Sequence, residues 1–523
     1  KVEAKEQASG QTIYHDDIQL SGQVYAALVT CTRAPAKIVS IDASAAASMP
    51  GFVAFIDSTD APFAAGSFAA LGEQQGENLF APVDGETLFV GQPVGLVVCS
   101  SRREAEAAAQ CVAVEYADPA APGVYTIAEA EAAGSYFDAL GPDIPLEPAA
   151  LEAALGPMTG NTGDELMAKV SDYVWGPGKR VVNRGDVEAA LQASKDADDQ
   201  TYVEGTLQIG GQSHFAMEKH TCVATTDEQG RLVIYASTQL PDHTRLLVAA
   251  NLGLDVSKVQ IIVKRLGGSY GAKLDKSFWS TIACTVAANK LRRPVHLQND
   301  IHTDMKLMGT ARHPTKSTYR AAMNSDGKIT AFDVVSTLNG GRCTGFAGFV
   351  AGEVLKNIES VYNIPNLRHE TRVVKTNTAT NGAVRGPGLV QAIAITENIV
   401  EHLAAASGIP ATEIRTNNIC ETEEATSTMH GGPVRKYNGK ALWDHICASS
   451  ELVSRKAAVD EFNGRNKWKK RGISAIPMKY GHAWVFAAGA NVQVSIQAAD
   501  AAIGAWGGPS VKVFQPCIEM GQG

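Results

Sequence analysis

The sequence lacks features that mark membrane and nucleic-acid-binding proteins. Its 523 residues contain no run of about 18 apolar residues, which a membrane-spanning helix needs, and the opening segment KVEAKEQASG has no apolar signal core. Basic residues are in deficit: the net charge is -9, and the dense cluster KWKKR at residues 467–471 is typical of a solvated turn. A nucleic-acid binder usually shows a basic face, so we expect neither a transmembrane segment nor a nucleic-acid partner.

Paired cysteines are also missing. The nine cysteines are scattered, and no two of them form a Cys-x-x-Cys pair. An odd, dispersed set in a large chain is typical of reduced cysteines in an intracellular protein, so we expect a cytoplasmic location. An iron–sulfur cluster needs grouped thiolates, which argues against a cluster held within this chain.

Strand and helix patterns predict an α+β fold class with a break in composition between two parts. Short β-branched runs and one alanine-rich helix pattern fill residues 1–130. Residues 131–200 are rich in Ala, Pro and Gly, which predicts a long connection with one or two short helices. Strands and helices alternate again over 201–523. The clearest helix pattern ends at Gly408, and Pro410 blocks its continuation.

A glycine-rich loop follows an apolar strand pattern in VQIIVKRLGGSYGAKLDKS, residues 259–277. The nucleotide-binding P-loop template fails, because Gly271 is followed by Ala-Lys-Leu, and the spacing of the glycines does not give a dinucleotide fingerprint. A strand–glycine–helix context still favours an anion or a polar cofactor against backbone N–H groups. A plain tight turn has the same pattern.

The stretch IGGQSHFAMEKHTCVA places Gln212 after two glycines. Its His214, Glu218 and His220 suggest a metal site, but their spacing fits no common ligand pattern, so we expect no metal bound directly by side chains.

Two further turns have small residues around a polar one. Arg385, in TNGAVRGPGLVQ, is open either to an anionic ligand or to loop carbonyl groups. The sequence ends with EMGQG, a Gly-rich turn, so we expect the protein to continue past Gly523 and to begin before Lys1.

Together these stretches resemble the molybdenum-cofactor-binding part of the xanthine dehydrogenase/aldehyde oxidase family. GGQSHF is similar to the family's Gly-Gly-Gln-Glu-His-Phe, RLGGSYGAKL to Arg-Met-Gly-Gly-Gly-Phe-Gly-Gly-Lys-Glu, VRGPG to Phe-Arg-Gly-Phe-Gly, and EMGQG to Glu-Met-Gly-Gln-Gly. YHDDI, RAPAKIVSIDAS, PGFVAFI and VGQPVGLVV resemble its hammerhead domain. The resemblance implies a hammerhead α+β domain over 1–130, a variable linker or insertion over 131–200, and the first part of a molybdenum-cofactor-binding α/β domain over 201–523.

The resemblance implies a molybdenum-pyranopterin cofactor whose metal is held by the pterin rather than by side chains. Gln212 matches a glutamine that hydrogen-bonds a molybdenum oxygen, and Arg385 matches an arginine that orients the substrate; these are the expected catalytic residues. The expected substrate contacts are Leu274, Arg385 and Tyr437. The expected cofactor-binding residues are Gly211, Gln212, Tyr270, Gly271, Ala272, Arg385, Met520, Gly521 and Gln522.

The activity implied by the resemblance is hydroxylation of a small-molecule aldehyde or N-heterocycle, purines included, with water as the oxygen source. Electrons would leave through 2Fe-2S and FAD centres in missing domains or partner subunits, the protein would be a homodimer, and the catalytic glutamate would follow Gly523. Leu274 stands where purine enzymes have a glutamate, Ser269 and Ala272 replace glycines, and Pro387 replaces an aromatic residue. These departures favour an alternative, a catalytically inactive relative that serves as a structural or assembly subunit.

Overall fold

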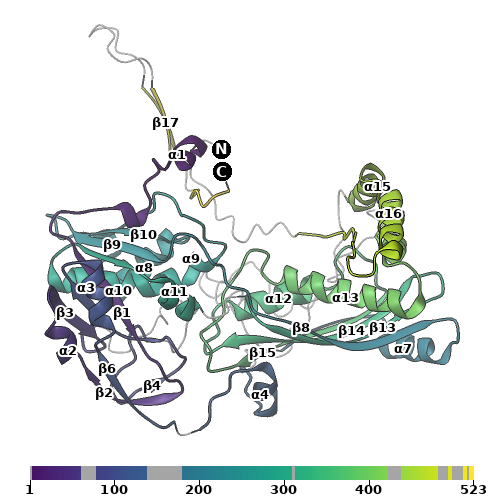
Figure 1. The fold of residues 1–523 in the computed structure, drawn as a ribbon, viewed down its shortest axis with the longest axis horizontal. Coiled ribbons are helices and arrows are strands. Elements are labelled where there is room, and N and C mark those ends of the chain that lie inside the picture. The colour runs from purple at the N-terminus through teal and green to yellow at the C-terminus, as the bar shows by residue number, and fades with distance from the viewer. Residues whose placement is uncertain are drawn as a thin grey trace, which may run out of the picture.

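The computed structural model describes residues 3–60, 78–119, 121–137, 179–308, 312–421, 437–480, 493–497, 510–514 and 517–522. Two lobes flank a central region in which loops from both lobes meet (Figure 1). One lobe is built on a seven-stranded sheet with a three-stranded sheet beside it, and the other is built on a five-stranded sheet. The candidate site residues lie mostly on the loops between the lobes.

The seven-stranded sheet joins strands that are far apart in the sequence. In spatial order its strands are β11 (Val259–Ile262), β10 (Leu232–Ala236), β9 (Thr221–Thr226), β12 (Val295–Gln298), β1 (Val24–Thr30), β5 (Pro93–Cys99) and β3 (Phe52–Asp57). β1 pairs antiparallel with β5 and parallel with β12, where Val24 lies opposite Val295. Every residue of β5 is buried, as expected for its continuous apolar run. The N-terminal strands and those after residue 220 therefore share one sheet and one core.

Local capping and turn residues account for the ends of the helices in this lobe. Helix α3 (Arg102–Ala109) begins after Ser101, whose hydroxyl accepts a hydrogen bond from the Glu104 amide. Helix α8 (Pro241–Leu252) ends at Gly253, which has a left-handed conformation. Helix α10 (Ser277–Leu291) is buried along most of its length because it packs into the core between α8 and the sheet.

The remaining elements of this part of the chain are short. The three-stranded sheet consists of β4 (Glu86–Thr87), β2 (Ala36–Asp42) and β6 (Ala113–Ala117). The short helices are α1 (Ala4–Ser9), η1 (His15–Asp17), α2 (Ser44–Ala47), α4 (Ile127–Ala132), η3 (Val256–Lys258), α9 (Ala272–Asp275) and α11 (Ile301–Met308).

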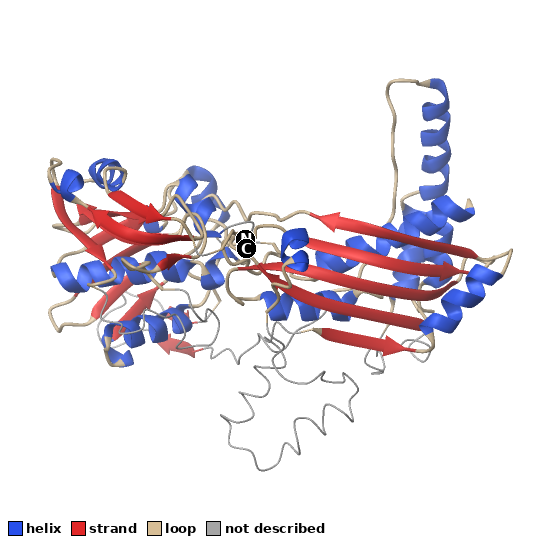
Figure 2. Ribbon diagram, turned by 90° about the horizontal axis from the view of Figure 1, so that it is seen from below, coloured by secondary structure: helices blue, strands red, loops and turns tan. Residues whose placement is uncertain are grey.

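The five-stranded sheet forms the second lobe, and its strands run toward the central region (Figure 2). In spatial order they are β7 (Arg180–Arg184), β15 (Asn366–Lys375), β14 (Ile329–Gly341), β13 (Thr315–Met323) and β8 (Thr201–Ile209). Side chains alternate between its faces. Ala321 and Phe332 pack with helices α12 (Ala347–Asn357) and α13 (Leu389–Ser407), whereas Ala322 and Ala331 pack with α7 (Val187–Asp196).

Helix α13 confirms the clearest helix prediction, because Gly408 caps it with φ +77° and Pro410 follows. Its buried face includes Ile395, Ile399 and Leu403. The helix leads directly out of the turn that contains Arg385, so its packing on the sheet fixes one end of that turn. β7 and α7 lie at the end of the connection expected over 131–200; residues 138–178 of it lie outside the described residues.

The last described elements follow α13 in the chain. They are α14 (Ala411–Asn418), α15 (Gly439–Ser449), α16 (Leu452–Arg465), β16 (Gln493–Gln497) and β17 (Ser510–Phe514). β16 and β17 pair antiparallel, with Ser495 opposite Lys512.

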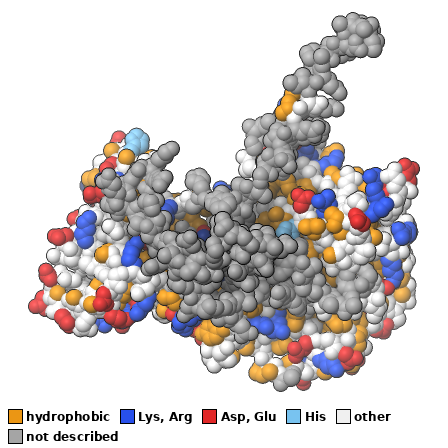
Figure 3. Space-filling view, turned by 180° about the vertical axis from the view of Figure 1, so that it is seen from behind, with side chains coloured by type: hydrophobic (Ala, Val, Ile, Leu, Met, Phe, Trp, Pro, Cys, Tyr) orange, Lys and Arg blue, Asp and Glu red, His pale blue; other side chains and the backbone are white. Residues whose placement is uncertain are grey.

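Charged side chains of both signs are interspersed on the two lobes where Figure 3 draws described atoms. Within the described residues no helix combines the length and apolarity that crossing a membrane requires. All nine cysteines lie in the described part of the chain, and none of them forms a disulfide.

Candidate functional site

The glycine loop between β11 and α9 approaches another backbone segment too closely for a side chain. Gly271 has φ +104°, and a Cβ there would lie 2.1 Å from the carbonyl oxygen of Ala383. Both conditions require glycine. Tyr270 has φ +54°, which is costly for a bulky residue, and its carbonyl accepts a hydrogen bond from the Arg385 amide at 2.9 Å. Tyr270 and Gly271 therefore lie directly against the turn that contains Arg385.

Arg312 joins that turn to the segment of Gln212. Its Nε donates to Gln212 Oε1 at 2.8 Å, and its Nη2 and Nη1 donate to the carbonyls of Arg385 at 2.8 Å and Gly386 at 3.2 Å. Its amide also donates to the Gln212 carbonyl at 3.0 Å. The Arg312 side chain is buried, and hydrogen bonds from a charged donor are the stronger kind. The predicted residues Gln212 and Arg385 are thus brought together by an arginine that sequence reasoning missed.

The predicted C-terminal turn reaches the same glycine loop. The Leu266 amide donates to the Glu519 carbonyl at 2.8 Å, and the Ser269 hydroxyl lies 3.2 Å from the Met520 sulfur. Within the turn, the Met520 amide donates to Gln522 Oε1 at 2.7 Å, and Gly521 has φ +104°. The turn therefore lies beside the loop on which Tyr270 and Gly271 are found.

His214 fixes a further contact between these segments. Its Nε2 donates to the Ala383 carbonyl at 2.8 Å, which leaves Nδ1 without a hydrogen. Nδ1 is buried and accepts no hydrogen bond within the described residues. Burial lowers the pKa of His214 to about 4, so the ring is neutral at pH 7. A buried acceptor in this position fits a ligand that brings its own donor.

The segment after Gly271 is a short helix rather than the start of a long one. α9 has only four residues, and Lys273 within it is not helical. The long helix α10 begins only at Ser277, after this short turn. Ala272 is buried, and Leu274 is partly buried against the core of the second lobe. Two of the four residues that depart from the family pattern, Ala272 and Leu274, are therefore wholly or partly buried next to Gly271.

Cationic and neutral nitrogen groups gather behind these loops. The Lys276 ammonium is buried and lies 3.9 Å from a carboxylate oxygen of Asp275, beyond hydrogen-bonding distance. Both ring nitrogens of His313 are buried and have no hydrogen-bond partner within the described residues. Burial, together with the charges of Lys276 and Arg312, lowers the pKa of His313 to about 3. Buried positive charge and unpartnered polar atoms at the junction of three turns fit a bulky anionic cofactor.

The metal interpretation of His214, Glu218 and His220 has no support in the geometry. His214 contacts Ala383, Glu218 binds other side chains, and His220 Nδ1 donates to Asp304 at 2.8 Å. Within the part of the chain that the structure describes, no group of three potential ligands is placed to hold a metal ion.

Tyr437 is the one predicted site residue that the structure places apart from the others. Its ring lies beside Gly439 at the start of α15, where a Cβ on Gly439 would meet the Tyr437 hydroxyl at 2.4 Å. Burial, followed by the nearby Cys420 thiol, raises the pKa of Tyr437 to about 12. The Cys420 amide donates to the Val361 carbonyl. This contact lies at the end of the five-stranded sheet where β15 begins, whereas the Arg385 turn follows the end of β15. No motif surrounds Tyr437 in the sequence.

Comparisons with known proteins identify the same two parts of the chain. Residues 9–119 match the aldehyde oxidase and xanthine dehydrogenase a/b hammerhead domain, and residues 175–419 match the molybdopterin cofactor-binding domain. The chain is 33% identical over 477 residues to xanthine dehydrogenase/oxidase of Felis catus, covering 91% of this chain and 32% of that protein. It is 31% identical over 527 residues to indole-3-acetaldehyde oxidase of Zea mays, covering 100% of this chain and 35% of that protein. The chain thus spans about a third of the length of these relatives.

Solved structures show the same fold. Quinoline 2-oxidoreductase from Pseudomonas putida 86 superposes with a TM-score of 0.71 at 23% identity, over 94% of this chain and 56% of that chain. Aldehyde oxidoreductase from Desulfovibrio desulfuricans superposes with a TM-score of 0.71 at 22% identity, over 88% of this chain and 47% of that chain. The predicted fold class, a hammerhead domain followed by a molybdenum-cofactor-binding domain, is confirmed. With its two matched domains and with relatives 31–33% identical over 91–100% of its length, the chain belongs to the xanthine dehydrogenase/aldehyde oxidase family.

Proposed function

We propose that this chain is the central, cofactor-binding part of a molybdenum hydroxylase that oxidises an aldehyde or an N-heterocycle, purines included, with water as the oxygen source. The relatives named above are about three times as long as the chain, so the activity belongs to a longer protein or a complex. Those relatives are named as dehydrogenases and oxidases. The alternative, an inactive assembly subunit, is based on the departures at Ser269, Ala272, Leu274 and Pro387 and is not supported better by the relatives.

The observation that carries the proposal is the position of Arg312 between the segments of Gln212 and Arg385. Because Arg312 Nε donates to Gln212 Oε1, the carboxamide is oriented with its NH2 group turned away from the arginine. That NH2 group is free to donate to an oxygen of a bound group. We assign this role to Gln212, as a residue that would hydrogen-bond the bound cofactor.

The residues present fit molybdopterin. Gly211, Gln212, Tyr270, Gly271, Ala272, Arg385 and the turn of Met520, Gly521 and Gln522 would surround it, and backbone close to Gly271 would pack against it. The cofactor, when bound, supplies the redox chemistry that oxidises the substrate carbon. The chain's own contribution is positioning and charge: Lys276 and Arg312 compensate the negative charge, and the acceptor atoms of His214 and His313 orient polar groups.

Arg385 and Leu274 are the proposed substrate contacts. The Arg385 side chain is exposed, and no ion pair of it is found within the described residues, so its guanidinium is available to a polar substrate edge. Leu274 has no hydrogen-bonding side chain, which favours an apolar substrate surface at that position. We therefore expect xanthine to be a poor substrate.

We propose further partners and a location on the same basis. Iron–sulfur and flavin domains or subunits would accept the electrons, and the whole protein would be a homodimer. The absence of disulfides among the nine cysteines supports a reducing, cytoplasmic compartment. The proposed division is a hammerhead domain over 1–130, a connection over 131–200 and a cofactor-binding part over 201–523. The matched range 9–119 lies within the first part, and most of the matched range 175–419 lies within the third.

The test uses the purified full-length protein. Metal analysis by mass spectrometry and pterin fluorescence after oxidation measure the cofactor, and reduction of a dye by an aldehyde or an N-heterocycle measures turnover. We expect stoichiometric molybdenum and turnover of at least one of the two substrate classes. Protein that folds but contains neither molybdenum nor pterin would contradict the proposal and favour the assembly subunit.

A further inference from the structure

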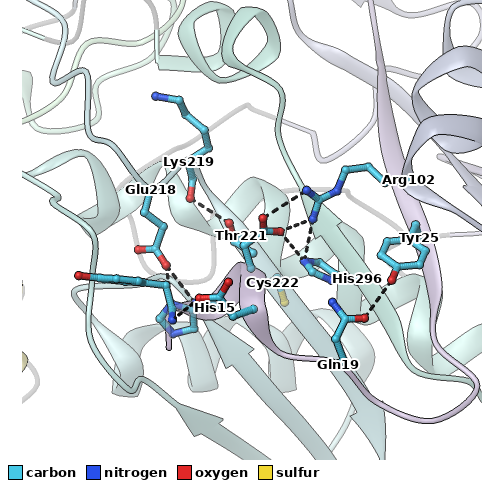
Figure 4. A network of polar contacts seen from close by, with 12 residues as sticks. His15, Gln19, Tyr25, Arg102, Glu218, Lys219, Thr221, Cys222 and His296 are labelled. Carbon is cyan, nitrogen blue, oxygen red and sulfur yellow. Dashed lines mark hydrogen bonds and ion pairs between the residues drawn. The ribbon is translucent and has the colours of Figure 1, made fainter. Parts of the chain in front are cut away.

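The carboxylate of Glu218 is surrounded by four hydrogen-bond donors, which come from His15 and from the two ends of the glycine loop. Oε1 accepts from the His15 amide at 3.2 Å and from His15 Nδ1 at 2.9 Å, and Figure 4 shows the ring of His15 beside the carboxylate. Oε2 accepts from the Gly267 amide at 2.9 Å and from Lys273 Nζ at 2.8 Å. The side chains of His15, Glu218 and Lys273 are 0%, 6% and 1% exposed.

One oxygen of this carboxylate therefore binds both ends of the glycine loop over residues 267–273. The backbone adds a third link, because the Glu218 amide donates to the Gly267 carbonyl at 3.0 Å. A Cβ on Gly267 would lie 2.6 Å from the Glu218 Cβ, so there is no room for a side chain at position 267. Tyr270 and Gly271 lie in the middle of the loop that is held in this way.

The other oxygen connects the loop to the N-terminal turn η1. His15 Nδ1 carries the hydrogen that it donates, and Nε2 is buried with no partner within the described residues. The next residue, Asp16, binds Arg102 of α3 at 3.2 Å and His296 of β12 at 3.1 Å. Figure 4 shows Arg102 and His296 on the side of the network away from Glu218. The turn is thus anchored on the first lobe independently of the glycine loop.

Charge makes the arrangement sensitive to substitution. Although burial opposes ionisation, the hydrogen bonds from His15 and the charge of Lys273 lower the pKa of Glu218 to about 2. Removing the carboxylate would leave a buried ammonium and three N–H groups without an acceptor, and a buried donor without a partner is strongly destabilising.

We propose that His15, Glu218 and Lys273 are positioning residues that hold the glycine loop in the conformation that presents Tyr270 and Gly271 to the cofactor. The N-terminal turn of the hammerhead domain thereby controls a loop that follows it by about 250 residues. The consequence for the cofactor rests on the proposed function. The consequence for the loop's conformation does not.

The test compares hydrogen exchange of peptides covering residues 267–273 in the full-length protein. Glu218→Gln removes the carboxylate acceptor, and His15→Leu removes the ring donor. His15→Asn restores a donor near the position of Nδ1. Lys273→Met removes the ammonium that binds Glu218 from the end of the glycine loop. Asp16→Asn is the matched control. Asp16 is next to His15, and its substitution breaks the ion pairs with Arg102 and His296 without changing a contact of the glycine loop.

We expect loop exchange to accelerate roughly tenfold or more in Glu218→Gln, His15→Leu and Lys273→Met, and to return close to the wild-type rate in His15→Asn. Asp16→Asn should lower the thermal midpoint without accelerating the loop. Unchanged loop exchange in His15→Leu, or equal acceleration in Asp16→Asn, overturns the proposal; the His15 series decides it if Glu218→Gln does not fold.

Molybdenum content measured on the same samples separates this proposal from the proposed function. Loop exchange that responds as expected in a protein without molybdenum supports the positioning role and contradicts the hydroxylase. Normal molybdenum content with unchanged loop exchange in the variants contradicts the positioning role and supports the hydroxylase.

Discussion

Arg312 Nε lies 2.8 Å from Gln212 Oε1, although the two residues are 100 positions apart and belong to different turns. The same guanidinium binds the carbonyls of Arg385 and Gly386. Two sequence motifs that local patterns could identify only separately are thus held together by one buried cation. The predictions below begin with this contact.

Arg312→Ala should separate the Gln212 segment from the Arg385 turn. The loss of three side-chain hydrogen bonds from a buried charged group should cost about 2–5 kcal/mol of folding stability and most of the bound molybdenum. Urea unfolding and metal analysis measure the two effects. Arg231→Ala is the control, since Arg231 pairs with Asp227 at the surface. Equal losses in both variants would contradict the role of Arg312.

Gly271→Ala should be far more damaging than an alanine at another left-handed glycine. The new Cβ would meet the Ala383 carbonyl at 2.1 Å, so one of the two backbones has to move. Gly253→Ala is the control, because Gly253 also has positive φ but has nothing within 4 Å of a Cβ. We expect about 1 kcal/mol for the control from backbone strain alone and several times that for Gly271. Thermal midpoints test this, and similar values would show that the close approach is unimportant.

His313 should make stability depend on pH. Its pKa is about 3 in the folded protein and 6.5 ordinarily, so between these values the unfolded chain binds more protons. Stability therefore falls as the pH falls from 6.5 toward 3, with a slope of about 1.4 kcal/mol per pH unit from this residue. In His313→Leu the free energy of unfolding, measured in urea from pH 7 to 4.5, should fall less steeply. His302→Leu, at an exposed position, should follow the wild type.

Leu274→Gln should change substrate preference if the proposed function holds. A glutamine adds a donor and an acceptor at a partly buried position, so the ratio of kcat/KM for a polar N-heterocycle over an aldehyde should rise roughly tenfold. Tyr437→Phe is the control, because Tyr437 lies beside α15. An unchanged ratio in Leu274→Gln, or an equal shift in Tyr437→Phe, would show that Leu274 does not face the substrate.

The sequence allowed accurate prediction wherever structure is set by neighbouring residues. Helix α13 and its end at Gly408, the cap of α3 at Ser101 and the left-handed Gly253 follow from local backbone preferences. The positions of Gln212, Tyr270, Gly271 and Met520 came from motifs whose spacing is short.

Interactions over long sequence distances were not predictable in this way. Arg312 has no pattern around it that distinguishes a buried cation from a surface one, and the partners of Glu218 come from residues 15, 267 and 273. Tyr437 is a further example, since no motif around it relates its position to that of the other candidate site residues. The parallel pairing of β1 with β12 likewise depends on packing in three dimensions rather than on either strand's residues.

That pairing has a consequence for attempts to study the parts in isolation. A fragment ending before residue 120 would leave one side of β1 without the backbone partners that β12 supplies, and the complementary fragment would have the same defect on β12. Each piece would present an unprotected ribbon edge, a template on which chains associate with one another. Co-expression of both fragments, rather than either alone, is the route to a well-behaved sample.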